Sequence, residues 1–162
     1  MIRVGVVTIS DRGYRGERED TSGEVIHKMV QGLGAEIAFS TVVPDEQEEI
    51  QKVLIQGADE MGLDLIVTTG GTGVSPRDVT PEATLEVIER EIPGFAEVMR
   101  MEGLKKTPHA MISRAVCGVR GRTLIVNLPG SPKAVQEGLE VIMPVLPHAI
   151  AKIQGDPSEC GR

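Results

Sequence analysis

The chain has 162 residues, a net charge of −7, 40% hydrophobic residues, and one Tyr and two Phe as its aromatic residues. This length fits one domain with a full hydrophobic core. The negative charge argues against binding to nucleic acid or to anionic membrane surfaces, because both need clustered Lys and Arg. So few aromatic side chains also provide no platform for stacking successive bases. A small anionic ligand would have to be bound by local groups.

The cysteines and the N-terminal segment indicate the compartment. Cys117 and Cys160 form no C-x-x-C pair, which argues against a zinc site or a disulfide framework and favours a reducing compartment. The first apolar stretch leads into a charged segment, unlike a signal peptide, and no apolar run is long enough to span a bilayer. We therefore expect a cytoplasmic protein.

The first half of the chain predicts alternating strands and helices. Three apolar, β-branched stretches predict buried strands at residues 2–9, 35–43 and 64–68. Thr21 or Ser22 can cap the first long helix, and Gly34 suits its C′ position. Asp45 and Glu48 have the spacing of a capping box, which predicts the next helix.

The second half continues the alternation after residue 80. Thr80 and Pro81 read as the N-cap and first residue of a helix, and a short helical piece surrounds Phe95. Two β-rich stretches, residues 113–119 and 122–128, flank a predicted hairpin turn at residues 120–121. Ser131 and Pro132 then have the order of an N-cap and a first helical residue. Prolines at 144 and 147 should break that last helix.

These elements predict an α/β fold of three layers, α/β/α, with a mostly parallel sheet and a small antiparallel hairpin. Residues 1–155 should form one domain, with a frayed tail at 156–162. Ligands of such sheets bind at the carboxyl ends of the strands. Four loops leave strands at this rim and can therefore converge: they begin at Ser10, Pro44, Thr69 and Pro129.

The loop after the third strand carries the strongest functional signal. Thr69 to Gly73 reads TGGTG, and glycines at such spacing allow the backbone N–H groups to form a nest for phosphate oxygens. The residues after Gly73 fit neither a P-loop nor a dinucleotide fingerprint. Asp78 would lie beside a bound phosphate, which predicts an intervening cation such as Mg²⁺. The alternative is a turn that only connects a strand to a helix.

Several ordered motifs resemble the MogA/MoaB family of molybdenum cofactor biosynthesis proteins and the related G domains of gephyrin-type fusions. The likeness covers nearly the whole chain. The motifs are residues 8–12 (TISDR), 44–45 (PD), 69–73 (TGGTG), 77–83 (RDVTPEA), 92–95 (IPGF), 113–114 (SR) and 127–132 (NLPGSP). The resemblance implies the molybdopterin-binding fold, trimers or hexamers, and transfer of AMP from Mg-ATP to the terminal phosphate of molybdopterin with release of pyrophosphate.

That reaction fits the residue types. A phosphate with a second pKa of about 6 is largely dianionic at neutral pH, so the attack needs no general base. The protein must instead position two polyanions and supply positive charge. Two alternatives stay open: a non-catalytic molybdopterin-binding or carrier protein of the same pathway, and a pyrophosphatase acting on a dinucleotide-like compound. The resemblance also allows transfer of the product to a molybdate-insertion protein.

The resemblance selects Asp45 and Asp78 as catalytic residues and Mg²⁺ ligands. From its local sequence Asp45 is as well explained as a helix cap, and Asp78 could merely favour the dipole of the following helix. Arginines are predicted to neutralise phosphate oxygens at Arg12, Arg77 and Arg114. Further contacts to substrate and nucleotide are predicted at Ser10, Asp11, Thr69, Gly70, Gly71, Thr72, Gly73, Ser113, Pro129, Gly130 and Ser131. The sequence leaves open whether adenine is bound on the Ser10 or the Pro129 side.

Overall fold

A computed structural model of the chain describes residues 1–161. Its six strands form one sheet in the order β2-β1-β3-β6-β5-β4. The strands are β1 (Arg3–Ile9), β2 (Glu36–Val43), β3 (Leu65–Thr69), β4 (Arg90–Glu91), β5 (Cys117–Arg120) and β6 (Thr123–Leu128). β2, β1, β3 and β6 run parallel, while β5 pairs antiparallel with both β6 and β4. The predicted mostly parallel α/β sheet with an antiparallel hairpin is confirmed.

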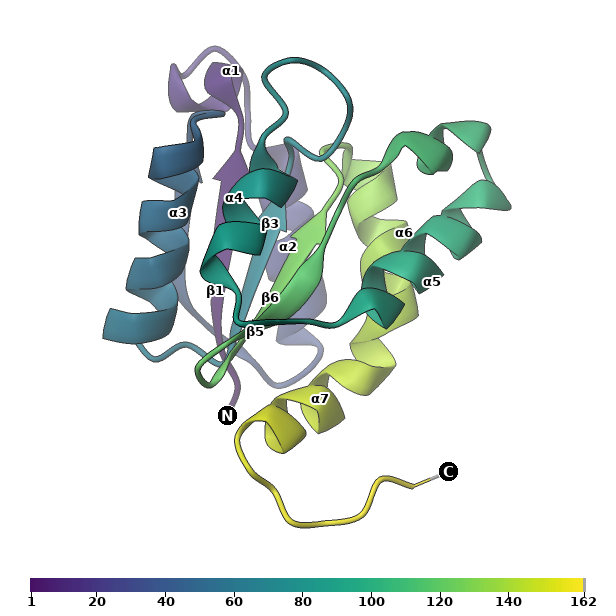
Figure 1. Cartoon of the computed structure of the whole chain (residues 1–162). Coiled ribbons are helices and arrows are strands. Elements are labelled where there is room, and N and C mark those ends of the chain that lie inside the picture. Colours follow the sequence, from purple (N-terminus) through teal and green to yellow (C-terminus); the bar gives the residue numbers. More distant parts are fainter. Residues whose placement is uncertain (162) are drawn as a thin grey trace.

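Helices cover both faces of this sheet (Figure 1). They are α1 (Asp11–Tyr14), α2 (Thr21–Gln31), α3 (Gln47–Ile55), α4 (Thr80–Val87), α5 (Pro93–Leu104), α6 (Pro132–Ile142) and α7 (Leu146–Ile153), with a π-helical turn at Gln56–Glu60 and 3₁₀ turns at Pro108–Ile112 and Met143–Val145. Buried side chains of α2, α5, α6 and α7 belong to one core, and those of α3 and α4 to a second core. The chain is therefore a three-layer α/β/α structure.

The strands separate the two cores by their alternation. In β6, Leu124, Val126 and Leu128 face the core under α2 and α6, whereas Ile125 faces the core under α3. Successive side chains of a strand point to opposite faces, so a strand buried on both sides must be apolar throughout. This explains why the central strands read as continuous apolar runs.

Two helix starts differ from the prediction. Asp20, rather than Thr21 or Ser22, caps α2, because its carboxylate accepts a hydrogen bond from the N–H of Gly23. The predicted capping box at Asp45 is wrong, since Glu46 holds the N-cap position of α3 without a side-chain hydrogen bond. The Asp45 carboxylate accepts from the N–H of Asp11 instead, across to the loop after β1. A long-range contact has replaced the local cap.

Further boundaries shift by a few residues. α2 ends at Gln31 with Gly32 as its C-cap, so Gly34, with φ of +68°, follows two residues later than the C-cap. Val79 is the N-cap of α4, and Thr80 is already helical. Ser113 ends a 3₁₀ turn and does not begin a strand.

The end of the chain largely follows the prediction. Ser131 caps α6 by accepting from the N–H of Ala134, with Pro132 as the first helical residue. α6 ends at Ile142, and a short 3₁₀ turn containing Pro144 leads into α7. After α7, residues 154–161 form neither helix nor strand. That this tail is frayed stays a prediction. In residues 1–161, no helix has the length and apolar character needed to cross a membrane.

Candidate active site

The loops after β1, β2, β3 and β6 converge at the carboxyl rim of the sheet, at the top of Figure 1. The N–H of Ser10 donates to the carbonyl of Val43 over 2.9 Å, and the N–H of Gly70 donates to that of Leu128 over 3.1 Å. The hydroxyl of Ser22 reaches the carbonyl of Gly130 over 2.6 Å. The predicted convergence of the four loops is therefore observed.

The glycine loop is held by α4. The hydroxyl of Thr80 donates to the carbonyl of Gly70 over 2.9 Å, and its N–H donates to that of Gly71 over 3.1 Å. Gly70 and Gly71 have backbone φ angles of +100° and +69°, which residues other than glycine rarely adopt. The N–H of Gly70 is already bonded, so it does not join the predicted phosphate nest. From Gly71 to Gly73, the N–H groups donate to no acceptor within residues 1–161.

Two pockets open beside this loop. The smaller, of about 230 Å³, is mostly polar and is lined by Thr8, Ile9, Ser10, Gly13, Arg18, Glu19, Asp20, Thr21, Ser22, Asp45, Thr69 and Gly70, among others. The larger, of about 670 Å³, lies between α5, α6 and the turn at 108–112 and has mainly apolar walls, including Ala96, Met99, Ile112 and Val141. Gly71, Asp78, Gly130 and Ser131 line both. The pockets therefore share one edge.

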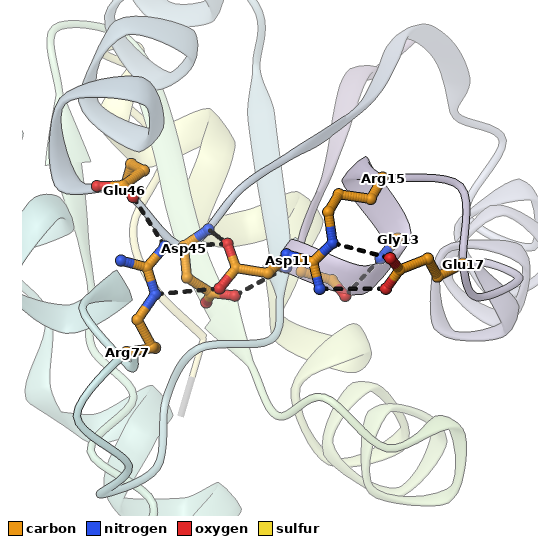
Figure 2. Close-up of polar contacts among 8 residues, drawn as sticks. Asp11, Gly13, Arg15, Glu17, Asp45, Glu46 and Arg77 are labelled. Atoms are coloured by element: carbon orange, nitrogen blue, oxygen red, sulfur yellow. Dashed lines mark hydrogen bonds and ion pairs between the residues drawn. The ribbon is translucent and has the colours of Figure 1, made fainter.

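Asp45 reaches this region with one free carboxylate oxygen. Its Oδ2 accepts from the N–H of Asp11 over 3.0 Å (Figure 2), and Oδ1 lies where a Cβ on Gly71 would come within 3.0 Å. Burial raises the pKa of Asp45, the hydrogen bond from Asp11 lowers it, and the charges of Asp11 and Asp78 raise it further, with a net increase. A nearby cation would relieve this unfavourable charge.

Asp78 lies at the shared edge of the two pockets. Its Oδ2 accepts from the N–H of Ser75 over 3.0 Å, and a Cβ on Gly73 would approach it to 2.9 Å. The missing side chains of Gly71 and Gly73 thus make room for the two carboxylates. Within the described residues, no group of three or more His, Cys, Asp or Glu could hold a metal. Two carboxylates nevertheless fit Mg²⁺, which keeps water and binds phosphate oxygens as its other ligands.

The predicted arginines are not directed into either pocket. Arg77 pairs with Asp11 and Glu46, while Arg114 pairs with Glu82 over 2.7 Å. Arg114 also donates to the carbonyls of Gly73 and Asp78, so it braces the glycine loop. Arg12 is exposed on α1. These three arginines and Asp11 line neither pocket. The phosphate contacts of the arginines and the nucleotide contact of Asp11 stay predictions.

The other predicted residues line one or both pockets, several with their polar atoms in use. Ser10 accepts from the N–H of Gly13 over 3.0 Å, and the Thr69 hydroxyl donates to the carbonyl of Pro129 over 2.6 Å. Ser113, Thr72 and Gly73 lie on the larger pocket. Substrate contacts at these positions stay predictions.

Sequence reasoning missed several lining residues. Arg18 and Asp20 come from the charged segment 13–21, for which no role was predicted, and they line the smaller pocket. Asp20 also accepts from the hydroxyl of Thr8 over 2.7 Å. The high charge of this segment is the sequence feature that could have indicated a binding role. The wall formed by Met99 had no comparable signal, because apolar positions of a helix usually face a core.

This arrangement, an α/β sheet with paired aspartates at a glycine loop between two pockets, defines a class of ligand-binding α/β domains. The sequence model of the family described as "Probable molybdopterin binding domain" matches residues 5–148, and the chain belongs to this family.

Similar proteins with known names agree with this family membership. The chain is 44% identical over 157 residues to the molybdopterin adenylyltransferase of Helicobacter pylori, covering 96% of this chain and 89% of that protein. It is 44% identical over 141 residues to the molybdopterin adenylyltransferase of Escherichia coli K12, covering 86% of this chain and 72% of that protein. The solved structure of the molybdopterin biosynthesis enzyme MoaB from Thermus thermophilus is 57% identical, with a TM-score of 0.92 over 98% of this chain and 100% of that one.

Proposed function

We propose that this chain is a molybdopterin adenylyltransferase, which transfers AMP from Mg-ATP to the terminal phosphate of molybdopterin and releases pyrophosphate. The observation that carries the proposal is the meeting of two pockets at an edge formed by Gly71, Asp78, Gly130 and Ser131. A reaction between two substrates needs two adjoining sites, with the reacting phosphates at their junction. The curated relatives of the same family carry the name of this activity.

The residues at the junction suit phosphate chemistry. The N–H groups of Gly71, Thr72 and Gly73, which have no acceptor within residues 1–161, can donate to phosphate oxygens. The N-terminus of α6 at Ser131 adds a partial positive charge. Asp45 and Asp78 would hold Mg²⁺, and the bound ion would supply charge that stabilises the phosphate oxygens. No side chain has to act as a base, because the attacking phosphate is already ionised.

The alternative is a carrier that binds molybdopterin or its adenylylated form without turnover. Both functions use the same pockets, but only catalysis requires two carboxylates beside the phosphates, where they would otherwise repel the ligand. Asp45 and Asp78 are both present at the rim, which favours the enzyme.

The test is to incubate the purified chain with molybdopterin, ATP and Mg²⁺ and to measure pyrophosphate and adenylylated molybdopterin. We expect both products in equal amounts, and neither when Mg²⁺ is removed with a chelator. Molybdopterin binding without either product would support the carrier. The trimeric or hexameric assembly, the cytoplasmic location and transfer of product to a molybdate-insertion protein stay predictions.

A further inference from the structure

Two hydrogen bonds join the loops after β1 and β2 as a reciprocal pair. The N–H of Asp45 donates to Oδ1 of Asp11 over 2.9 Å, and the N–H of Asp11 donates to Oδ2 of Asp45 over 3.0 Å (Figure 2). Each carboxylate therefore fixes the backbone of the other residue. Because 34 residues separate the two aspartates, this contact sets the position of one loop relative to the other.

Arg77 holds the Asp11 carboxylate from the side opposite Arg15 (Figure 2). Its Nε lies 3.1 Å from Oδ2 and its Nη2 lies 3.1 Å from Oδ1 of Asp11. Nη2 also lies 2.8 Å from Oε1 of Glu46, at the start of α3. A planar guanidinium matches a carboxylate in this two-point geometry. With the N–H of Asp45, the Asp11 carboxylate receives three donors and a compensating charge.

The two aspartates therefore differ in how many of their carboxylate oxygens accept hydrogen bonds. Both oxygens of Asp11 are bonded, which leaves this carboxylate poorly suited to bind a cation. In Asp45 only Oδ2 accepts a hydrogen bond from another described residue, and Oδ1 lies beside Gly71 at the smaller pocket. Two acidic side chains at one rim thus present a single open oxygen between them.

We propose that Asp11 and Arg77 are positioning residues, which hold the Asp45 carboxylate with Oδ1 toward the cation and keep Asp11 from binding it. This rests on the proposed function, which makes Asp45 a ligand of Mg²⁺. Mg²⁺ demands near-ideal octahedral geometry, and hydrogen bonds to a ligating carboxylate set its orientation. The proposal replaces the phosphate contact predicted for Arg77 and the nucleotide contact predicted for Asp11.

The test measures cation binding directly. Mn²⁺ serves as a spectroscopic substitute for Mg²⁺, and α,β-methylene-ATP serves as the nucleotide, because it cannot undergo adenylyl transfer. Electron paramagnetic resonance of Mn²⁺ in the presence of the analogue gives the Mn²⁺ affinity. We expect Asp11→Ala and Arg77→Ala each to weaken it by about 10–100-fold, as outer-shell changes do. The double variant should be no worse than the more affected single variant, because both changes break one unit.

Arg15→Ala is the matched control. Arg15 is as exposed as Arg77, with side-chain exposures of 55% and 56%, and forms an ion pair with Glu17 in the same view (Figure 2). Its removal subtracts the same charge close to Asp11 without touching the reciprocal pair. We expect the Mn²⁺ affinity to change by no more than about twofold. An equal loss in Arg15→Ala would reduce the effect to general electrostatics and overturn the proposal.

Two further results would overturn it. One is an unchanged Mn²⁺ affinity in Asp11→Ala. The other is an Arg77→Ala variant that loses analogue binding equally with and without Mn²⁺, which would make Arg77 a direct phosphate ligand. A wild-type chain that binds no Mn²⁺ with the analogue would refute the proposed metal-dependent function itself. If Asp11→Ala does not fold, Asp11→Asn, which keeps the shape and one acceptor oxygen, takes its place.

Discussion

Asp45 and Asp64 occupy opposite ends of the same sheet, and the fold treats their charges in opposite ways. Asp64 immediately precedes β3, with a side chain only 11% exposed. It accepts from the N–H of Arg3 over 2.8 Å, from Gln154 over 2.6 Å and from Arg122 over 2.9 Å. Burial raises its pKa, but these donors together outweigh burial and lower it. For Asp45, burial and neighbouring carboxylates outweigh its one donor and raise the pKa.

The opposite pKa shifts of Asp64 and Asp45 indicate that Asp64 contributes to stability and Asp45 to function. At the amino end of β3 the charge of Asp64 is matched by donors from three segments, so ionisation favours the folded state. At the carboxyl rim the carboxylates of Asp45 and Asp78 form no ion pair within residues 1–161, and each accepts one hydrogen bond from a backbone N–H. An unmatched charge costs stability unless a ligand compensates it, and residues of this kind mark functional sites.

The largest effect is expected for Asp78→Asn. This change keeps the shape and the hydrogen bond from Ser75 but removes a charge at the shared edge of the pockets. We expect Mg-ATP-dependent pyrophosphate release to fall by about 10²–10³-fold, as losses of electrostatic stabilisation do. Molybdopterin binding, measured by equilibrium titration, should stay near normal. Unchanged turnover would remove Asp78 from the mechanism.

The next effect is on stability, at the other end of the sheet. Asp64→Ala leaves the donors of Arg3, Gln154 and Arg122 without their acceptor. We expect the free energy of unfolding in urea to fall by about 2–3 kcal/mol, as for hydrogen bonds to a buried charge. Asp59→Ala is the control, because Asp59 pairs with Arg120 at an exposed site and should cost less than about 1 kcal/mol. Equal losses would show that burial of the Asp64 cluster does not matter.

Much of the rim could be predicted from the sequence, because parallel strands bring their carboxyl ends together whatever the distance along the chain. Apolar strands and punctuating glycines therefore sufficed to place Asp45, Asp78 and the glycine loop at one edge. The partners of charged side chains could not be predicted. Arg77 bonds to Asp11 across 66 positions and Arg114 to Glu82 across 32, so local patterns carry no trace of either choice. For the same reason the local sequence explained Asp45 equally well as a helix cap.

A smaller effect on stability is expected when the charge of Asp64 is changed by pH. The pKa of Asp64 is lowered in the folded state, so its contribution is complete above the unfolded value of about 3.9 and is lost as pH falls through the folded value. The stability difference between wild type and Asp64→Asn should therefore be largest near pH 7 and shrink below pH of about 4. Unfolding in urea at several pH values measures it. A difference independent of pH would mean that packing, rather than ionisation, stabilises this cluster.

The smallest expected effect on stability, and the one of opposite sign, belongs to Asp45→Asn. The folded-state pKa of Asp45 is raised, so its ionisation opposes folding above that pKa and has no effect well below the unfolded value of about 3.9. The neutral amide keeps an acceptor for the N–H of Asp11 and removes this cost. We expect a gain of about 1 kcal/mol or less in unfolding free energy at pH 7, no gain at pH 3, and loss of turnover. Calorimetric or urea unfolding of the metal-free protein decides it. A destabilised Asp45→Asn at pH 7 would show that the rim is as well compensated as Asp64, and the contrast between the two ends of the sheet would fail.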